Sequence, residues 1–162
     1  MMPPAIKHNR RSFIMDDIDI KLLHILSDNS NQTATEIMSQ INLSIPAINK
    51  RIAKMRASGL IKKFTLSVDA KMVGKPVLAY IMVILNQYSE VEELVKYIRS
   101  DKDIVECHAI TGEYDYILKM YARDIEHLEE KLIKLKKQKG ISKSQTMFSL
   151  LEYKNSPGPL PD

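Results

Sequence analysis

Hydrophobic positions along the chain change their spacing once, close to residue 60. Before that point, Ile18, Leu22 and Leu26 recur four residues apart, which is the spacing of one face of an α-helix. After it, short apolar runs alternate with stretches of helical period. We therefore expect a helical N-terminal part, followed by a part that combines strands and helices.

Three helices are expected between residues 16 and 59. The first begins among acidic side chains, which suit the positive end of a helix dipole; they are Asp16, Asp17 and Asp19. Thr33, three residues before Glu36, has the spacing of a capping box and begins a short second helix. Ser44 can cap a third helix, which ends at Gly59. A short helix, a tight connection and a third helix are typical of a helix-turn-helix unit.

The rest of the chain repeats one pattern twice, a strand, a helix and a strand. The four strands are expected at 77–85, 104–110, 114–122 and 145–153. Gly112 and Glu113 form the tight turn between the two copies. This βαββαβ order is that of a ferredoxin-like domain with right-handed crossovers. The predicted fold class is therefore α+β, with a three-helix (winged) helix-turn-helix domain followed by a ferredoxin-like domain.

These elements divide the chain into five segments. Residues 1–15 are expected to form a basic, flexible arm that precedes the helix-turn-helix domain at 16–68. Residues 69–76, which include Gly74 and Pro76, form a linker to the ferredoxin-like domain at 77–153. The proline-rich residues 154–162 are expected to be a flexible tail.

Charge adds information only in the helix-turn-helix part. The net charge of the chain is +4, but residues 44–63 contain six basic side chains and no acidic one. Such a cluster on one short segment indicates a polyanionic partner, here double-stranded DNA. A solvated helix face is the plainer interpretation of the same cluster.

The third helix is the candidate DNA reader, and its expected inner face consists of Ile45, Ile48, Ile52 and Met55. On the outer face, Asn49 can pair with adenine, and Lys50 or Arg51 with guanine or a phosphate. The basic residues from Lys54 onward are expected to neutralise phosphates. The predicted DNA-binding residues are Ser44, Pro46, Ala47, Asn49, Lys50, Arg51, Lys54, Lys62 and Lys63.

Catalytic, metal and cofactor sites are not indicated, so we expect a protein that is not an enzyme. The four histidines have no metal-ligand spacing, and Cys107 and His108 point to opposite faces of an expected strand. No apolar stretch approaches the roughly 18 residues of a membrane helix, and the N-terminus lacks a signal-peptide pattern. A cytoplasmic location without membrane partners is therefore expected.

Several segments together resemble the Lrp/AsnC (feast/famine) family of transcription regulators. Three runs, 15–23, 43–52 and 58–62, resemble the N-terminal domain of that family. The run Gly112-Glu-Tyr-Asp-Tyr resembles the turn between the middle strands of its C-terminal domain, often called RAM. The resemblance covers roughly residues 15–153 and keeps the order and spacing of the family.

The resemblance implies a DNA-binding regulator that forms dimers, which assemble further into tetramers or octamers. It also implies that the RAM domain binds an amino acid or a related metabolite between dimers. The effector site then falls on Gly112, Glu113, Tyr114 and Asp115, with Thr146 as a further candidate. Asp115 or Glu113 can take the amino group of the effector, while backbone N–H groups take its carboxylate.

The strands themselves also predict a homodimer. In the run 77–85, Tyr80, Met82 and Ile84 alternate with residues that are equally apolar. A ferredoxin-like sheet carries helices on one face only, so its second apolar face is expected to be covered by another copy of the chain. The same two-fold symmetry predicts a pseudo-palindromic DNA site.

We therefore expect a sequence-specific transcription regulator that an amino acid modulates. Two alternatives stay open on the sequence. One is an architectural protein that binds DNA with weak specificity. The other is a ferredoxin-fold protein that binds small molecules and has no DNA function.

Overall fold

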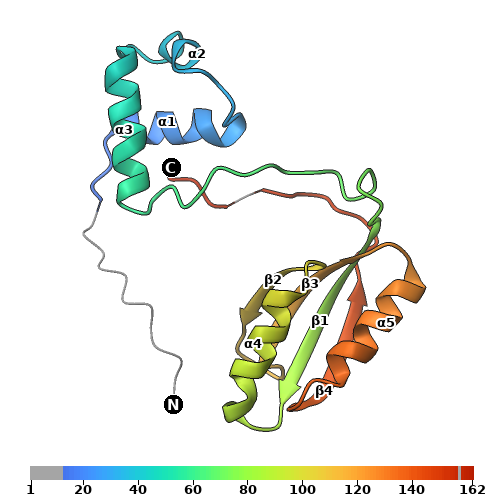
Figure 1. The fold of residues 1–162 in the computed structure, drawn as a ribbon. Coiled ribbons are helices and arrows are strands. Elements are labelled where there is room, and N and C mark those ends of the chain that lie inside the picture. The colour runs from blue at the N-terminus through green and yellow to red at the C-terminus, as the bar shows by residue number, and fades with distance from the viewer. Residues whose placement is uncertain (1–12, 157) are drawn as a thin grey trace. The chain divides into compact units, whose positions relative to one another are not determined.

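A computed structural model of the protein describes residues 13–156 and 158–162 (Figure 1). The chain divides into two compact units. Among the described residues, a helical unit contains those from Phe13 through Leu66 together with Lys154–Asp162, and a sheet unit contains Ser67–Tyr153. Most of the expected basic arm, residues 1–12, lies outside the described residues.

Three helices form the helical unit, as the sequence predicts: α1 (Asp17–Asp28), α2 (Ala34–Met38) and α3 (Ile45–Ala57). The side chain of Asp16 accepts a hydrogen bond from the Asp19 N–H at 2.9 Å and caps α1. Thr33 and Glu36 form the predicted capping box on α2. Ser44 stands at the N-cap of α3 but makes no side-chain capping bond. One reason is that Pro46 lies in the first turn and has no N–H, so it cannot donate the hydrogen bond that a capping side chain would accept there.

The core of the helical unit consists of Leu22, Leu26, Ile37, Ile41, Ile48 and Met55. Ile45, expected on the inner face of α3, is instead exposed at the first residue of the helix. Phe13 packs against this core, and the ammonium of Lys54 lies 5.0 Å from the centre of its ring. The folded unit therefore reaches at least to Phe13, three residues before the expected start of the helix-turn-helix domain at residue 16.

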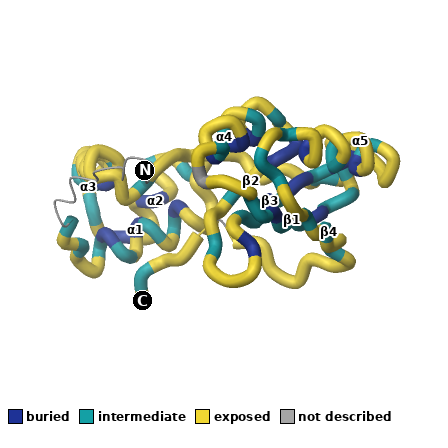
Figure 2. Tube along the Cα trace, turned by 90° about the horizontal axis from the view of Figure 1, so that it is seen from below, coloured by how far each residue is buried: buried dark blue, intermediate teal, exposed yellow. Residues whose placement is uncertain are grey.

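The sheet unit has the predicted ferredoxin-like order. Its elements are β1 (Val77–Leu85), η1 (Tyr88–Glu90), α4 (Val91–Ser100), β2 (Ile104–Ala109), β3 (Tyr116–Ala122), α5 (Ile125–Lys136) and β4 (Ile141–Phe148). The strands lie in the order β2-β3-β1-β4 and every neighbouring pair is antiparallel. Both long helices lie on one side of this sheet (Figures 1 and 2).

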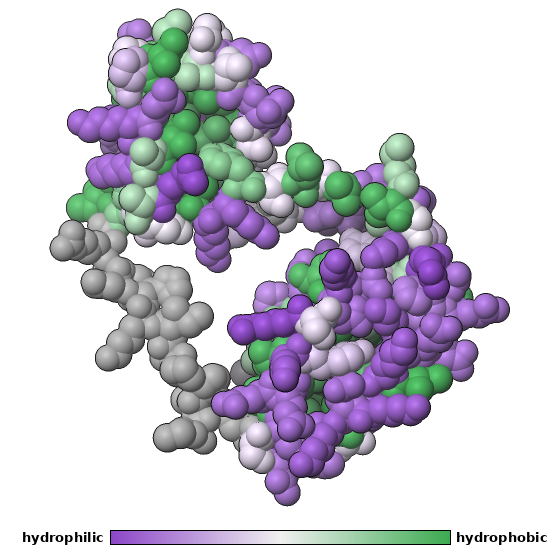
Figure 3. All heavy atoms as spheres, viewed as in Figure 1, coloured by the Kyte–Doolittle hydropathy of each residue, from purple (hydrophilic) through white to green (hydrophobic). Residues whose placement is uncertain are grey.

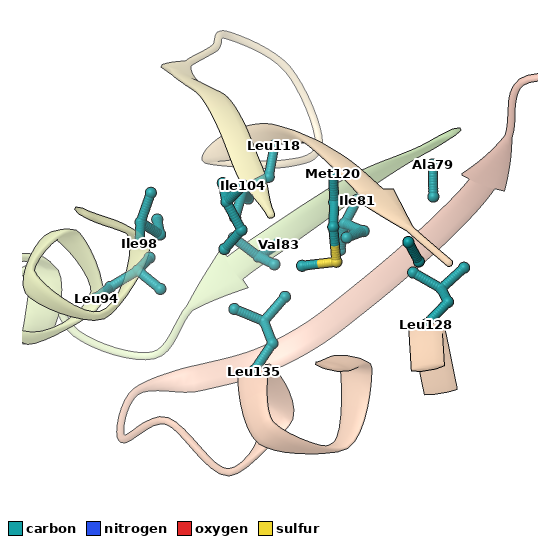
Figure 4. Packing of buried hydrophobic residues seen from close by; sticks show 11 residues of the cluster. Ala79, Ile81, Val83, Leu94, Ile98, Ile104, Leu118, Met120, Leu128 and Leu135 are labelled. Carbon is teal, nitrogen blue, oxygen red and sulfur yellow. The ribbon is translucent and has the colours of Figure 1, made fainter. Parts of the chain in front are cut away.

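One face of the sheet packs against α4 and α5. The buried side chains there are Ala79, Ile81, Val83, Leu94, Ile98, Ile104, Leu118, Met120, Ala122, Leu128 and Leu135 (Figure 4). On the other face, which we call the open face, alternate residues of β1 and β3 are only half-buried; they are Tyr80, Met82, Ile84, Ile117, Lys119 and Tyr121. The central strand β1 is therefore apolar on both faces, whereas Lys119 of β3 and Lys143 and Gln145 of β4 make the open face partly polar, and only the other face is covered within the chain.

Three strands, β2, β3 and β4, have bounds that differ from those expected. The tight turn at Gly112 and Glu113 is a longer loop, 110–115, in which the Ile110 N–H donates to the Asp115 carbonyl at 2.9 Å. The last strand lies at Ile141–Phe148 rather than at 145–153. It begins directly after Gly140, whose φ of 95° suits glycine. Polar residues follow Ile141, as an edge strand permits; they include Ser142, Lys143 and Ser144.

Apolar side chains are exposed along the segments that follow α3 and β4 (Figure 3). In the first, Leu66 is 87% exposed and Val68 64%; in the second, Leu150 is 96% exposed. The segment after α3 is extended, as expected, yet it contains no strand among the described residues before β1. The tail is not wholly free, since His24 of α1 hydrogen-bonds the Pro161 carbonyl at 3.0 Å.

Candidate nucleic-acid interface and effector loop

The helix α3 presents a basic outer face to solvent. Ile48 and Met55 are fully buried, which fixes the rotation of the helix about its axis. Asn49, Lys50 and Lys54 are exposed on the opposite side, where the sequence predicted them. Ser44 and Pro46 are exposed at the N-terminal end of α3, and Ala47 is half-buried beside them. The structure thus brings together most of the predicted DNA-binding residues on one accessible helix face.

Arg51, predicted as a DNA reader, has other partners. Its Nη1 lies 2.8 Å from Asp16 Oδ2 and 2.7 Å from Asp19 Oδ1, and Asp19 is almost completely buried. The hydrogen bonds to Asp19 and Asp16 raise the pKa of Arg51. The Asp19 N–H, and after it Arg51, lower the pKa of Asp16. Arg51 therefore joins α3 to the beginning of α1.

The basic surface continues beyond α3. Lys62 and Lys63 are exposed in the extended segment that follows the helix. Arg56, which the sequence analysis did not select, lies with its guanidinium 5.9 Å from the ring centre of Phe64. The contact with the Phe64 ring orients the Arg56 guanidinium, which is close in sequence to the two lysines. Its signal in the sequence, an arginine eight residues before a phenylalanine, is too weak to be found there.

The predicted effector residues lie on loop 110–115 and on β4. Gly112 has a φ of 120° and is exposed, and Glu113 beside it is also exposed. The Glu113 carboxylate lies 2.6 Å from the ammonium of Lys143 on β4, and this hydrogen bond raises the pKa of Lys143. The Lys143 ammonium is also 5.2 Å from the ring centre of Tyr114. Lys143 was not predicted, because nothing in the sequence connects it to a loop thirty residues earlier.

Asp115 is exposed, and it bonds the loop to β1. Its carboxylate accepts a hydrogen bond from the Leu85 N–H at 2.8 Å, and its own N–H donates to the Val83 carbonyl at 3.0 Å. Both partners belong to β1. The Asp115 carboxylate, which was expected to bind the amino group of an effector, is thus already hydrogen-bonded to the backbone of β1.

Tyr114 and β4 complete the surroundings of the loop. Tyr114 is buried, and its hydroxyl donates to Gln145 Oε1 at 2.5 Å. Thr146 pairs with Ile81, whose side chain faces the helices, whereas Lys143 and Gln145 share the open face with their partners on β1. The structure therefore does not bring Thr146 to the loop; Lys143 and Gln145 stand there instead.

The described residues give little support for a metal site, a nucleophilic cysteine or a membrane-spanning helix. Within the described part of the chain, no group of three or more His, Cys, Asp or Glu side chains is arranged to hold a metal ion. Burial raises the pKa of the Cys107 thiol, which keeps it protonated and a poor nucleophile. Across the same residues, none of the helices is both long and apolar enough to span a membrane.

Both units match known families. Residues 15–62 match the family described as winged helix-turn-helix DNA-binding, and residues 78–159 match the Lrp/AsnC ligand binding domain. The HTH-type transcriptional regulator FL11 of Pyrococcus furiosus is 35% identical over 146 residues, which cover 88% of this chain and 94% of FL11. The regulator LrpC of Bacillus subtilis is 28% identical over 144 residues, which cover 89% of this chain and 99% of LrpC.

Solved structures show the same fold. The structure of LrpC from Bacillus subtilis superposes with a TM-score of 0.81 at 26% identity, covering 89% of this chain and 100% of LrpC. The regulator NMB0573 of Neisseria meningitidis, in complex with L-methionine, superposes with a TM-score of 0.86 at 24% identity. That match covers 89% of this chain and 95% of NMB0573.

Proposed function

Since this chain belongs to the Lrp/AsnC family of transcription regulators, we propose that α3 reads a specific DNA sequence and that an amino acid modulates this binding. The observation that carries the proposal is the exposed face of α3. Asn49, Lys50 and Lys54 are exposed there, while Ile48 and Met55 hold the helix from behind. A helix anchored in this way can enter the major groove without distortion of its domain.

The proposed contacts are divided between bases and phosphates. Asn49 and Lys50 address base edges, and Lys54, Lys62 and Lys63 neutralise phosphates. Ser44, Pro46 and Ala47, at the N-terminal end of α3, lie against the groove edge. Arg51 supports DNA binding indirectly, by joining α3 to Asp16 and Asp19, because its guanidinium is bonded to both carboxylates.

The proposed effector is an amino acid bound beside loop 110–115. The L-methionine in the NMB0573 complex supports this class of ligand. Glu113 receives the amino group, because it is exposed whereas the Asp115 carboxylate is bonded to the Leu85 N–H. Gly112 and Tyr114 shape the loop, and Thr146 contributes to the fold of β4 rather than to the ligand contacts.

We also propose a homodimer that forms through the open face and assembles further into tetramers or octamers. Tyr80, Met82 and Ile84 are half-buried on that face, with Met147 of β4 beside them. A partly apolar sheet face of this kind is typical of a protein interface. Binding is then the whole activity of the protein, without catalysis, and it takes place in the cytoplasm.

Selection of bound sites from a random DNA pool, followed by salt-dependent gel shifts, tests the DNA-binding part. Lys50→Ala should weaken binding to the selected site by about 1–3 kcal/mol and reduce discrimination against random DNA. Lys62→Ala should weaken binding to every sequence alike and lower the salt slope by about one unit. Lys96→Ala on α4 changes an exposed lysine in the other unit and should leave both unchanged.

Each alternative has its own outcome in this experiment. Equal affinity for selected and random DNA would indicate an architectural protein. No DNA binding at any salt concentration would leave a ferredoxin-fold protein that binds small molecules. Equal effects of Lys50→Ala and Lys62→Ala would show that α3 is not the reader.

A further inference from the structure

Glu113 and Lys143 form an ion pair at the surface of the effector loop. The two side chains come from loop 110–115 and from β4, and their charged atoms are 2.6 Å apart. The side chains are 66% and 53% exposed, so water reaches both charges. Exposed ion pairs contribute little to stability, because solvent screens them and two long side chains must be held in one conformation. The fold therefore does not depend on this pair.

The surroundings of the pair are fixed even though the pair is not. The Tyr114 ring lies under the Lys143 ammonium at 5.2 Å, and the Tyr114 hydroxyl is bonded to Gln145 on the same face of β4. Asp115 bonds the loop to β1 on the other side of Tyr114. Two exposed charges of opposite sign thus lie beside a loop that hydrogen bonds attach to β1 and β4, at the site where the effector is proposed to bind.

We propose that Lys143 determines the specificity of the effector site, by exchanging its partner Glu113 for the carboxylate of an incoming α-amino acid. Glu113 then takes the ammonium group of the ligand. This inference rests on the proposed effector site and adds the residue that receives the carboxylate of the ligand. The ligand must carry both charges, because only a dipolar ligand leaves Glu113 and Lys143 each with an opposite charge.

Ligands with a single charge disturb this balance. A primary amine would pair with Glu113 but leave the Lys143 ammonium beside a second cation. A carboxylic acid would pair with Lys143 but leave the Glu113 carboxylate beside a second anion. Like charges in contact repel each other, so both classes should bind more weakly than an amino acid.

Calorimetric titration of the full-length protein tests the exchange. Each of the twenty L-amino acids is titrated first, and the best ligand is then compared with its own decarboxylated amine and its deaminated acid. For L-methionine these are 3-(methylthio)propylamine and 4-(methylthio)butanoic acid. The wild-type protein should bind the amino acid at least about tenfold more tightly than either analogue.

Two variants should give opposite patterns. Lys143→Gln should lose about tenfold in affinity for the amino acid and for the acid, while its affinity for the amine is kept or increases. Glu113→Gln should lose affinity for the amino acid and the amine but keep the acid. Lys139→Gln, an exposed lysine shortly before β4, should behave as the wild type. A general loss of binding through misfolding cannot produce this crossed pattern.

The outcomes separate this inference from the proposed function. If no amino acid binds the wild-type protein, both the proposed effector role and the proposed exchange are wrong. If an amino acid binds but Lys143→Gln binds it equally well, only the exchange is wrong. The same conclusion follows if the wild-type protein binds the amine as tightly as the amino acid.

Discussion

At the level of single residues, Arg51 joins two helices of the DNA-binding unit through Asp16 and Asp19. Asp19 is 3% exposed, so Arg51→Met leaves a buried carboxylate without its guanidinium. We expect this variant to loosen the first turn of α1, which amide hydrogen exchange across Asp17–Asp28 would show as faster exchange. Its affinity for DNA should fall because the reader helix is less well supported.

Lys50→Met is the matched control, since it changes the neighbouring basic residue on the same helix. Lys50 is exposed, so exchange in α1 should stay as in the wild type while DNA affinity falls. Unchanged exchange in Arg51→Met would show that the ion pairs do not support α1.

Residue roles could be predicted from the sequence only where the partners are close along the chain. The capping pairs Asp16–Asp19 and Thr33–Glu36 span three residues, and both are present. Arg51 and its partner Asp16 are 35 residues apart, so its basic character alone placed it among the readers. Asp115 is an expected ligand through the family resemblance, and the sequence does not reveal its bond to the Leu85 N–H on β1, thirty residues earlier.

At the level of elements, Asp103 connects three segments of the sheet unit. It precedes β2 and pairs with Lys131 of α5 and with Lys75, which precedes β1. His127 of α5 also faces it, with Nε2 at 3.7 Å. Burial raises the pKa of Asp103, but the hydrogen bonds and charges of Lys131 and Lys75 outweigh burial and lower it to about 2.

Acid should therefore weaken the sheet unit in a defined range of pH. The folded pKa of about 2 lies below the ordinary value of 3.8, so the contribution of Asp103 is complete above pH 4 and is lost as the pH falls toward 2. It amounts to about 2 kcal/mol. Urea unfolding at several pH values should show a flatter acid dependence for Asp103→Asn than for the wild type. Identical slopes would exclude this role.

The order of the elements in the sheet unit could be predicted, and their ends could not. The central strand β1 has the predicted bounds, because its run of apolar residues from Val77 to Leu85 is unbroken. The edge strand β4 begins with Ile141, Ser142 and Lys143, a pattern that is typical of a loop. Its hydrogen bonds with β1, rather than its side chains, define it as a strand.

At the level of the whole molecule, the proposed homodimer depends on the open face. Met82 lies near the middle of that face, between Ile117 of β3 and Gln145 of β4. Met82→Glu would bury two unpaired carboxylates in a two-fold dimer, so its dissociation constant should rise at least about 100-fold. Light scattering at micromolar concentration should show a dimer or a larger assembly for the wild type and a monomer for the variant.

Ile125→Glu provides the control on the helical side of the same unit. Ile125 is 58% exposed at the first residue of α5, where an acidic side chain is well tolerated. This variant should assemble as the wild type does. A monomeric wild-type protein, or a Met82→Glu variant that still dimerises, would contradict the proposed interface.

Loop 110–115 keeps one backbone shape because Asp115 bonds it to β1 at two points. What can move there are the ends of Glu113 and Lys143, two exposed side chains on separate segments. Ligand preference is thereby separated from folding. Substitution of Glu113 or Lys143 can therefore change the charge that the site requires of its ligand, from a zwitterion to an acid or an amine, while the fold stays intact.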